Sequence, residues 1–377
     1  MTTPDLVVVG GGVTGTATAL AAAQRGLRTV LLERFEIGHR HGSSHGPSRI
    51  IRLAYHEVEY ITLAREAFER WRGLERDIDP PLLRTTGGLD CGMSGTPSLE
   101  QTIEAMREAD VPVDALSSSD LAARFPQISF DPGMVGVYQP DAAVLYADQC
   151  VAALARRARE SGAEIRERSL VQRIESAPGS VTIAVNGTTI TAGAVVIAAG
   201  SWANTLLFRP LRLAVTREQV AYFDAAEHFA VGRFPLVLEH NAEAPPLVAA
   251  FPRLPPNGWV KLMYHRNGPA IDTENLAGTA DQAALTDLTG YAHRRLRGLG
   301  RVREVETCRY TMTPDEDFVL DAVPGQPGVW LASACSGHGF KFGPVVGETM
   351  VDLLTMGTTT RPTARFAINR PALSTLD

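Results

Sequence analysis

Two basic side chains in this chain have apolar neighbours and glycine close by. Arg52 follows two isoleucines, and Lys341 lies between two phenylalanines in a glycine-rich stretch. A guanidinium together with an ammonium is well suited to bind a carboxylate, because both donate charge-assisted hydrogen bonds. A surface ion pair for Arg52 and a solvated Lys341 are the ordinary alternatives, but the apolar neighbours favour partly buried cations. Each cation, if partly buried, could therefore contribute to binding a small anion.

A glycine cluster near the N-terminus has the spacing of a dinucleotide-binding loop, G-x-G-x-x-G. Gly10 permits a tight turn, Gly12 allows the backbone to approach a pyrophosphate, and Gly15 lets the next helix pack closely on the sheet. Glu33 ends the following apolar strand, where its carboxylate can accept hydrogen bonds from both ribose hydroxyls. A glycine loop that is only a turn is the alternative. The order of strand, loop, helix, strand and acid favours dinucleotide binding.

The segments around this loop predict the βαβ unit that must position it. Residues 6–9 are apolar, residues 16–25 are rich in alanine and leucine, and residues 27–32 are apolar again. A strand of small residues at 193–200 and an apolar segment at 329–332 follow much later. The N-terminal position of the loop and the return strand at 193–200 favour FAD over NAD.

Between these regions the chain changes to strand and loop with scattered helix. We therefore expect it to leave the nucleotide domain and to return twice. The expected FAD-binding domain comprises residues 1–85, 146–215 and 306–377. The expected substrate domain comprises residues 86–145 and 216–305.

The composition limits the classes of partner. The formal net charge of −6 argues against a nucleic acid or an anionic membrane as partner. No apolar run reaches the roughly 18 to 20 residues that a membrane helix needs, and the N-terminus lacks the features of a signal peptide. The four cysteines include no CxxC pair, so we expect neither a disulfide framework nor a metal site. A cytoplasmic enzyme is the simplest interpretation.

Several separated motifs make the chain similar to one known family. In order, they are GSSHGPSRIIR at 42–52, KLMYH at 261–265, CRYTMTPDEDF at 308–318, SGHGFKF at 336–342 and NRP at 369–371. With them the chain resembles the monomeric sarcosine oxidase and N-methyltryptophan oxidase group of the D-amino-acid oxidase superfamily. The resemblance covers nearly the whole chain.

This resemblance implies an α/β fold in which a Rossmann-type FAD-binding domain is interleaved with an α+β substrate domain that contains a large mixed sheet. It also implies a monomer whose FAD is bonded through its 8α-methyl group to a cysteine, and Cys308 is the matching residue. A small buried apolar role is the ordinary alternative for Cys308. Cys335 is the rival for the bond, although relatives usually carry an aromatic residue there.

The same resemblance implies how the substrate is bound. Arg52 and Lys341 match the residues that hold its carboxylate, and Tyr310 matches a tyrosine that faces it. Ala249 stands where relatives that oxidise sarcosine carry a tyrosine. The loss of a phenol opens the pocket, so a bulkier N-alkyl or cyclic imino acid is expected instead of sarcosine.

Four further residues are expected near the reacting groups. Arg49 and Lys261 match cations that face the flavin from its two sides, where positive charge favours reduced flavin and superoxide. Lys261 matches the lysine that activates oxygen. His265 and His45 match active-site histidines, which are suited to proton transfer near neutral pH. An exposed strand lysine and structural histidines are the ordinary alternatives.

The residues expected to contact FAD come from every part of the nucleotide domain. They are Gly10, Gly12, Val13, Thr14, Gly15, Glu33, Arg34, Ser43, Ser44, Arg49, Val171, Ala199, Gly200, Trp202, Cys308, Gly337, Gly339, Phe340 and Lys341.

The expected function is an FAD-dependent oxidase of a secondary α-amino acid, with N-methyl, N-alkyl and cyclic substrates included. Hydride passes from the carbon attached to nitrogen to flavin N5, oxygen is the acceptor, and the products are an imine and hydrogen peroxide. A D-amino-acid oxidase or an amine dehydrogenase of the same superfamily is the first alternative. A non-catalytic flavin-binding protein is the second.

Overall fold

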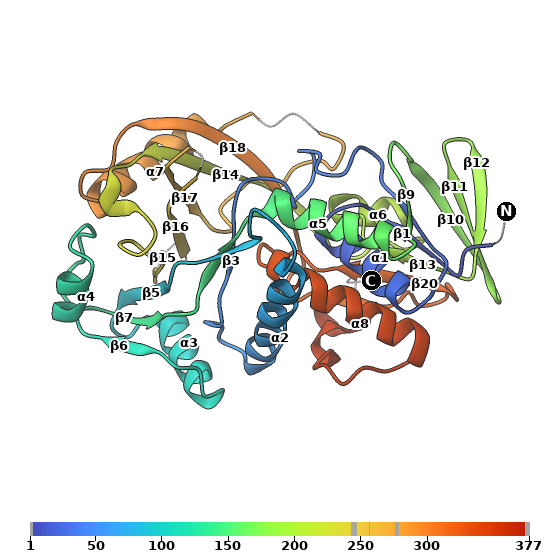
Figure 1. Ribbon diagram of the computed structural model, residues 1–377, viewed down its shortest axis with the longest axis horizontal. Helices are drawn as coiled ribbons and strands as arrows, with labels where there is room; N and C mark the ends of the chain where they lie inside the picture. Colours follow the sequence, from blue (N-terminus) through green and yellow to red (C-terminus); the bar gives the residue numbers. More distant parts are fainter. Residues whose placement is uncertain (1–2, 243–246, 256, 276–278, 374–377) are drawn as a thin grey trace.

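A six-stranded sheet forms the core of one half of the molecule in the computed structural model, which describes residues 3–242, 247–255, 257–275 and 279–373 (Figure 1). Its strand order is β19-β20-β13-β1-β2-β9, and every pair is parallel except β19–β20. The strands are β1 (Leu6–Val9), β2 (Thr29–Leu32), β9 (Glu164–Arg166), β13 (Ala194–Ile197), β19 (Val319–Ala322) and β20 (Val329–Ser333).

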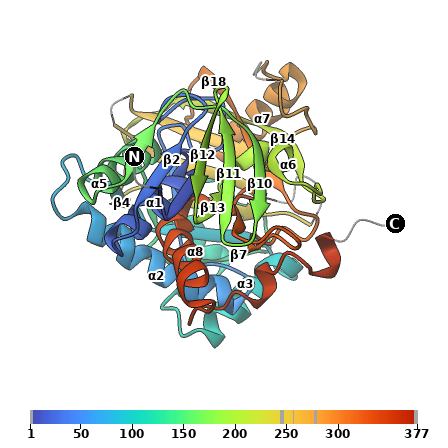
Figure 2. The ribbon, with the colours of Figure 1, turned by 90° about the vertical axis from the view of Figure 1, so that its right-hand side faces the viewer.

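The two faces of this sheet are covered by different layers, and alternation along β1 shows how. Leu6 and Val8 pack with helices α1 (Val13–Gln24), α5 (Ala147–Glu160) and α8 (Gly343–Met356). Val7 and Val9 pack on the opposite face against a three-stranded antiparallel sheet (Figure 2). That sheet consists of β10 (Val171–Ala177), β11 (Ser180–Val185) and β12 (Thr188–Ala192). Because both faces are buried, β1 is apolar throughout.

The other half of the molecule contains an eight-stranded sheet in the order β18-β14-β17-β16-β15-β5-β7-β6. Its pairs are antiparallel except β15–β5, which is parallel, so the expected large mixed sheet is confirmed. Its strands are β5 (Gly88–Met93), β6 (Asp114–Leu116), β7 (Met134–Gln139), β14 (Ala214–Asp224), β15 (Leu236–His240), β16 (Leu247–Leu254), β17 (Trp259–Tyr264) and β18 (Val302–Met312).

Shorter elements complete the fold around the two large sheets. A small sheet pairs β8 (Ala143–Leu145) with β3 (Arg49–Ile51) and β4 (Leu83–Thr85). The remaining helices are α2 (Val58–Glu75), α3 (Pro97–Glu108), α4 (Ser118–Arg124), α6 (Ala203–Leu206) and α7 (Gln282–Arg295). None of the helices in the described ranges is long and apolar enough to cross a membrane.

Two long strands connect the halves. β14 and β18 pair along their length, from Ala214 opposite Met312 to Phe223 opposite Val302. Both strands cross the domain limits expected at 215/216 and 305/306, so a single hydrogen-bonded ribbon belongs to both sides. The division into two domains stays a prediction, and β14–β18 is the rigid link that would join them.

Helix α8 packs closely on α1 because a glycine lies at their contact. A Cβ atom on Gly347 would lie 2.5 Å from the backbone carbon of Ala17. We expect Gly347→Ala to lower the free energy of unfolding by about 1–3 kcal/mol, because the helices must separate. Urea denaturation measures this change.

Gly73 gives a matched control, since it also lies within a helix but would place its Cβ in open space. Gly73→Ala should raise the free energy of unfolding by roughly 0.5–1 kcal/mol. Equal effects of the two substitutions would contradict this account of the α1–α8 contact.

Candidate active site

A large cavity of about 390 Å³ lies where the two halves meet, within the size range of small-molecule and cofactor sites. Of the residues expected from the sequence to bind cofactor or substrate, all except Gly15 line it. Gly15 has a different place, because its Cβ would lie 1.8 Å from the carbonyl oxygen of Gly10. It therefore permits the close contact between α1 and the loop before it.

The loop between β1 and α1 forms one end of the cavity. Gly10 has a φ of 107°, and a Cβ there would lie 2.4 Å from the carbonyl oxygen of Ala198, just after the neighbouring strand β13. The loop therefore needs glycine for both its conformation and its packing. The N-terminus of α1 opens into the cavity, with Val13 and Thr14 among the lining residues. Backbone N–H groups at such a terminus suit a pyrophosphate.

Glu33 fixes this loop from the end of β2. Its side chain is buried, and its two carboxylate oxygens accept hydrogen bonds from the backbone N–H groups of Gly11 (2.5 Å) and Phe35 (2.7 Å). Oε1 also lies 3.4 Å from Nε2 of His39, whereas Oε2 keeps a second lone pair that can accept from a ribose. Nearby, the guanidinium of Arg34 lies 5.2 Å and 5.3 Å from the ring centres of Phe35 and Trp202 and pairs with Glu274.

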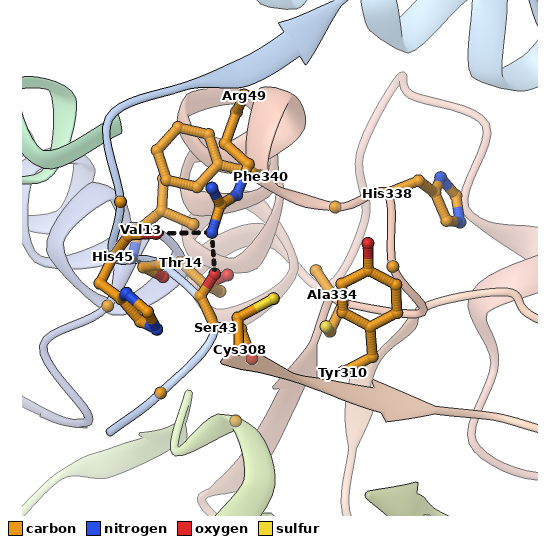
Figure 3. Close-up of a pocket in the computed structure, with 18 of the residues that line it drawn as sticks. Val13, Thr14, Ser43, His45, Arg49, Cys308, Tyr310, Ala334, His338 and Phe340 are labelled. Atoms are coloured by element: carbon orange, nitrogen blue, oxygen red, sulfur yellow. Dashed lines mark hydrogen bonds between the residues drawn. The ribbon is translucent and has the colours of Figure 1, made fainter. Parts of the chain in front are cut away.

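The segment before β3 is folded around the guanidinium of Arg49. This group donates hydrogen bonds to the carbonyl oxygens of Ser43 (2.9 Å) and His45 (2.6 Å) (Figure 3). A third bond goes to the carbonyl oxygen of Ser48 (2.8 Å). Its carbon lies 5.7 Å from the centre of the Phe340 ring. The cation is thus held by neutral carbonyl groups, and its charge is left to act on the cavity.

Unpartnered polar atoms in this segment test whether FAD fits. The hydroxyl of Ser43 and both ring nitrogens of His45 are buried and have no hydrogen-bond partner within the described ranges. Burial, with Arg49 as the next cause, lowers the pKa of His45 to about 3, so its ring is neutral. Buried polar atoms are nearly always paired. Atoms of this kind lining a cavity beside the glycine loop fit a cofactor rich in polar groups.

One face of the eight-stranded sheet forms the opposite wall. Because side chains alternate along a strand, Cys308 and Tyr310 project from β18 to the same side (Figure 3). Lys261 on β17 pairs with Tyr222 on β14, whose neighbour β18 carries Cys308. All of these residues line the cavity. The period of two therefore gathers residues from three strands on one surface.

Lys261 is a buried cation on this surface. Its ammonium donates to the carbonyl oxygen of Ser48 at 3.1 Å and lies 4.5 Å from the ring centre of Phe251. Burial, and next the positive charge of Arg49, lower its pKa to about 7. The ammonium is poised between charge states, so a nearby anion would stabilise its charged form.

His265 and Tyr310 form a neutral pair beside the cations. The His265 Nδ1 lies 3.2 Å from the Tyr310 hydroxyl. Burial, followed by Arg266, lowers the pKa of His265 well below its usual value, and burial raises that of Tyr310. Both side chains are therefore uncharged at neutral pH and can offer hydrogen bonds without adding charge.

Lys341 is held by residues that the sequence did not single out. Its ammonium donates to the Tyr55 hydroxyl and to the carbonyl oxygen of His338, both at 2.7 Å. The His338 ring in turn contacts the Tyr55 hydroxyl at 3.2 Å through Nδ1. Burial, and next the charge of Arg52, lower the pKa of Lys341. The SGHGFKF motif contains His338, but nothing nearby in the sequence points to Tyr55.

Arg52 lies at the cavity wall and forms an ion pair that the sequence did not predict. Its Nη1 lies 2.9 Å from Asp90 Oδ1, and the same oxygen lies 2.9 Å from Nε2 of His240. Asp90 is the only acidic residue of strand Gly88–Met93, whose other residues are apolar or glycine. A single acidic residue in an otherwise apolar strand is the sequence feature that could have identified Asp90 as a buried partner.

Cys308 differs from the other cysteines in its surroundings. Cys91 and Cys150 are buried in apolar cores, away from the cavity, whereas Cys308 and Cys335 line it. Burial raises the pKa of the Cys308 thiol, while Arg49 and Lys261 act in the opposite direction. Cys335 has a separate contact, because its sulfur accepts the backbone N–H of Thr311 at 3.3 Å.

Together, the parallel sheet with its glycine loop and the cavity lined by cations beside it define a dinucleotide-dependent oxidoreductase. A family model described as DAO, FAD dependent oxidoreductase, matches residues 5–353. The chain belongs to this family of FAD-dependent oxidoreductases. The loop, the unpartnered polar atoms and the cations line one cavity, whose chemistry fits the FAD on which this family depends.

Named relatives agree with this assignment. Monomeric sarcosine oxidase of Bacillus sp. (strain B-0618) is 32% identical, covering 98% of this chain and 96% of that protein. N-methyl-L-tryptophan oxidase of Yersinia pestis (strain Pestoides F) is 30% identical over 91% of this chain and 93% of that protein. The solved structure of NikD, an unusual amino acid oxidase essential for nikkomycin biosynthesis, superimposes with a TM-score of 0.86 at 26% identity, covering 97% and 98%. The resemblance expected from the motifs is confirmed.

The loop at Gly337 supports the pair formed by Tyr310 and His265. Gly337 has a φ of 77°, and its Cβ would lie 2.6 Å from a ring carbon of Tyr310 and 2.9 Å from one of His265. We expect Gly337→Ala to push these rings apart and to slow amine-dependent bleaching of the flavin by roughly 10²-fold, as misplaced groups do. Stopped-flow absorbance measures this rate.

Gly325→Ala is the control, because Gly325 has a similar φ of 74° but would meet no atom within 4 Å. It should cost about 1–2 kcal/mol of stability and leave the bleaching rate unchanged. A comparable loss of rate in both variants would refute a steric role for Gly337.

Proposed function

We propose that this protein is an FAD-dependent oxidase of a secondary α-amino acid. The observation that carries the proposal is a group of four cations in one cavity with the dinucleotide loop. Lys261 and Lys341 are buried, and Arg49 and Arg52 are partly buried. An anionic substrate and an electron-rich cofactor are the ligands that such a cavity favours. Relatives named as oxidases of sarcosine and N-methyl-L-tryptophan support the choice of an N-alkyl amino acid.

The residues at the nucleotide end would hold FAD. The glycine loop and the N-terminus of α1 would bind its pyrophosphate, Glu33 would bind its ribose, and the segment folded around Arg49 would hold its ring system. We propose Cys308 as the covalent attachment. When bound, FAD would supply the two-electron chemistry of the reaction: it would take up a hydride from the carbon attached to nitrogen and pass the electrons to oxygen, with an imine and hydrogen peroxide as products.

The cations and the neutral pair formed by His265 and Tyr310 would have different roles in binding the substrate. Arg52 and Lys341 bind its carboxylate, since Lys341 has a donor left after its bonds to Tyr55 and His338. The same positive charges disfavour a protonated amine, so the substrate is held with its nitrogen lone pair free. Tyr310 and His265 offer hydrogen bonds to that nitrogen without a charge, and burial excludes water.

Ala249 sets the space for the substituent on the substrate. It is buried on β16, lines the cavity and pairs with Met263 on β17 and Leu238 on β15. A methyl group among these side chains leaves room that a larger residue would fill. We therefore propose a bulkier N-alkyl or cyclic substrate. We also propose a cytoplasmic monomer that uses oxygen as its acceptor.

The direct test is anaerobic bleaching of the flavin by a panel of amines. The panel contains sarcosine, N-methyl-tryptophan, L-proline, L-pipecolate and several D-amino acids. We expect a secondary amino acid larger than sarcosine to bleach the flavin fastest, and Ala249→Tyr to shift the preference towards sarcosine. Bleaching by D-amino acids alone would favour a D-amino-acid oxidase, and no bleaching at all would favour a non-catalytic flavoprotein.

The covalent bond at Cys308 is tested without activity. Wild-type protein precipitated in acid should retain yellow flavin in the pellet, and Cys308→Ala should release it to the supernatant. Cys335→Ala is the matched control, because Cys335 lines the same cavity. Retention of flavin by Cys308→Ala, together with its release by Cys335→Ala, would assign the bond to Cys335.

Lys261 should act on oxygen and not on the amine. Removal of its charge in Lys261→Met should slow reoxidation of the reduced protein by oxygen about 10²- to 10³-fold, because positive charge stabilises the forming superoxide. Anaerobic bleaching by the best amine should change less than about tenfold. Equal losses in the two half-reactions, each followed by stopped-flow absorbance, would argue against this role.

A further inference from the structure

A buried carboxylate lies directly behind the guanidinium that faces the cavity. Asp90 is 2% exposed, and its Oδ1 accepts from Arg52 Nη1 at 2.9 Å. The same oxygen lies 2.9 Å from His240 Nε2, and His240 Nδ1 lies 3.1 Å from the hydroxyl of Ser98. These contacts link α3, β15 and β5 to Arg52.

The direction of these hydrogen bonds follows from the chemistry of the groups. A carboxylate only accepts, so the proton between Asp90 and His240 is on Nε2. The other ring nitrogen then accepts from the Ser98 hydroxyl when the ring is neutral. Both nitrogens of His240 are therefore used within the protein. His240 has no ring nitrogen left for a ligand, and it donates a hydrogen bond to Asp90.

Arg52 keeps one edge of its guanidinium unused. Nη1 donates to Asp90 and to the carbonyl oxygen of Ala54. Among the described residues, Nε and Nη2 have no hydrogen-bond or ion-pair partner. The guanidinium carbon lies 5.5 Å from the centre of the Tyr55 ring, and both Arg52 and Tyr55 line the cavity. That edge can donate two parallel hydrogen bonds to one carboxylate. A side chain fixed before binding also loses less conformational entropy when the ligand arrives.

We propose that Asp90 and His240 are positioning residues for the proposed oxidase. They hold Arg52 so that its Nε and Nη2 edge faces the substrate carboxylate. The inference rests on the proposed function, because it assigns that carboxylate to Arg52. Asp90 acts through its hydrogen bond as well as through its charge, so a neutral residue of the same shape should preserve much of the effect.

The test compares propanoate with uncharged propanamide as ligands of the holoprotein, with binding followed by the flavin absorbance. Asp90→Leu should weaken propanoate binding about 10- to 100-fold and leave that of propanamide within about twofold. Asp90→Asn should recover most of the propanoate affinity. In an Arg52→Met background, Asp90→Leu should have no further effect on propanoate. In Asp90→Leu, a saturating concentration of substrate should restore most of the wild-type rate of flavin bleaching.

The alternative outcomes separate the two proposals. Wild-type protein that neither binds propanoate nor is bleached by any amine overturns the proposed function and this inference with it. Only the inference is overturned if the wild type binds propanoate and is bleached by an amine, but Asp90→Leu does not lose propanoate selectively. That result would be either unchanged propanoate binding or an equal loss of propanoate and propanamide. If Asp90→Leu fails to fold, His240→Leu replaces it and should also weaken propanoate binding selectively, by a smaller factor. No selective loss of propanoate binding in His240→Leu would then overturn the inference.

Discussion

The rest of the structure depends on the burial of several positive charges in one cavity. Taking a cation out of water is costly unless a partner compensates it. Arg49 is held by three carbonyl oxygens, Lys261 by the carbonyl of Ser48, and Lys341 by a phenol and a carbonyl. Arg52 is the fourth cation, and among the described residues it alone of the four forms an ion pair. The other three therefore lie at the cavity without a carboxylate partner in the described ranges, and an anionic group that binds beside them stabilises the fold.

The fold provides this arrangement from distant parts of the chain. Arg49 comes from β3, Lys261 from the middle of the eight-stranded sheet, and Lys341 from the turn before α8. The six-stranded sheet places the glycine loop opposite them, and the β14–β18 ribbon keeps the two sides in register. Tight packing of α8 on α1 through Gly347 then fixes the Lys341 turn close to the loop. Rigid elements of this kind keep the charges together in spite of their repulsion.

The sequence predicted well what depends on local pattern. The βαβ unit, the glycine loop and Glu33 follow from spacing, and the large mixed sheet follows from the family motifs. The sequence could not reveal Asp90 and His240, because their contact depends on a parallel pairing of β5 with β15. Tyr55 was missed for a similar reason, since it meets Lys341 across 286 positions of the chain. The limits expected at 215/216 and 305/306 cut across strands whose length only pairing partners reveal.

The central claim is that buried positive charge holds the carboxylate of a secondary amino acid. The most direct measurement compares anaerobic bleaching by the best amino-acid substrate with bleaching by its decarboxylated amine, in wild type and in Lys341→Met. The account predicts that loss of the carboxylate lowers the second-order rate constant in wild type by about 10²-fold or more, and that the difference shrinks markedly in the variant. Equal rate constants for the two amines in wild type would contradict it.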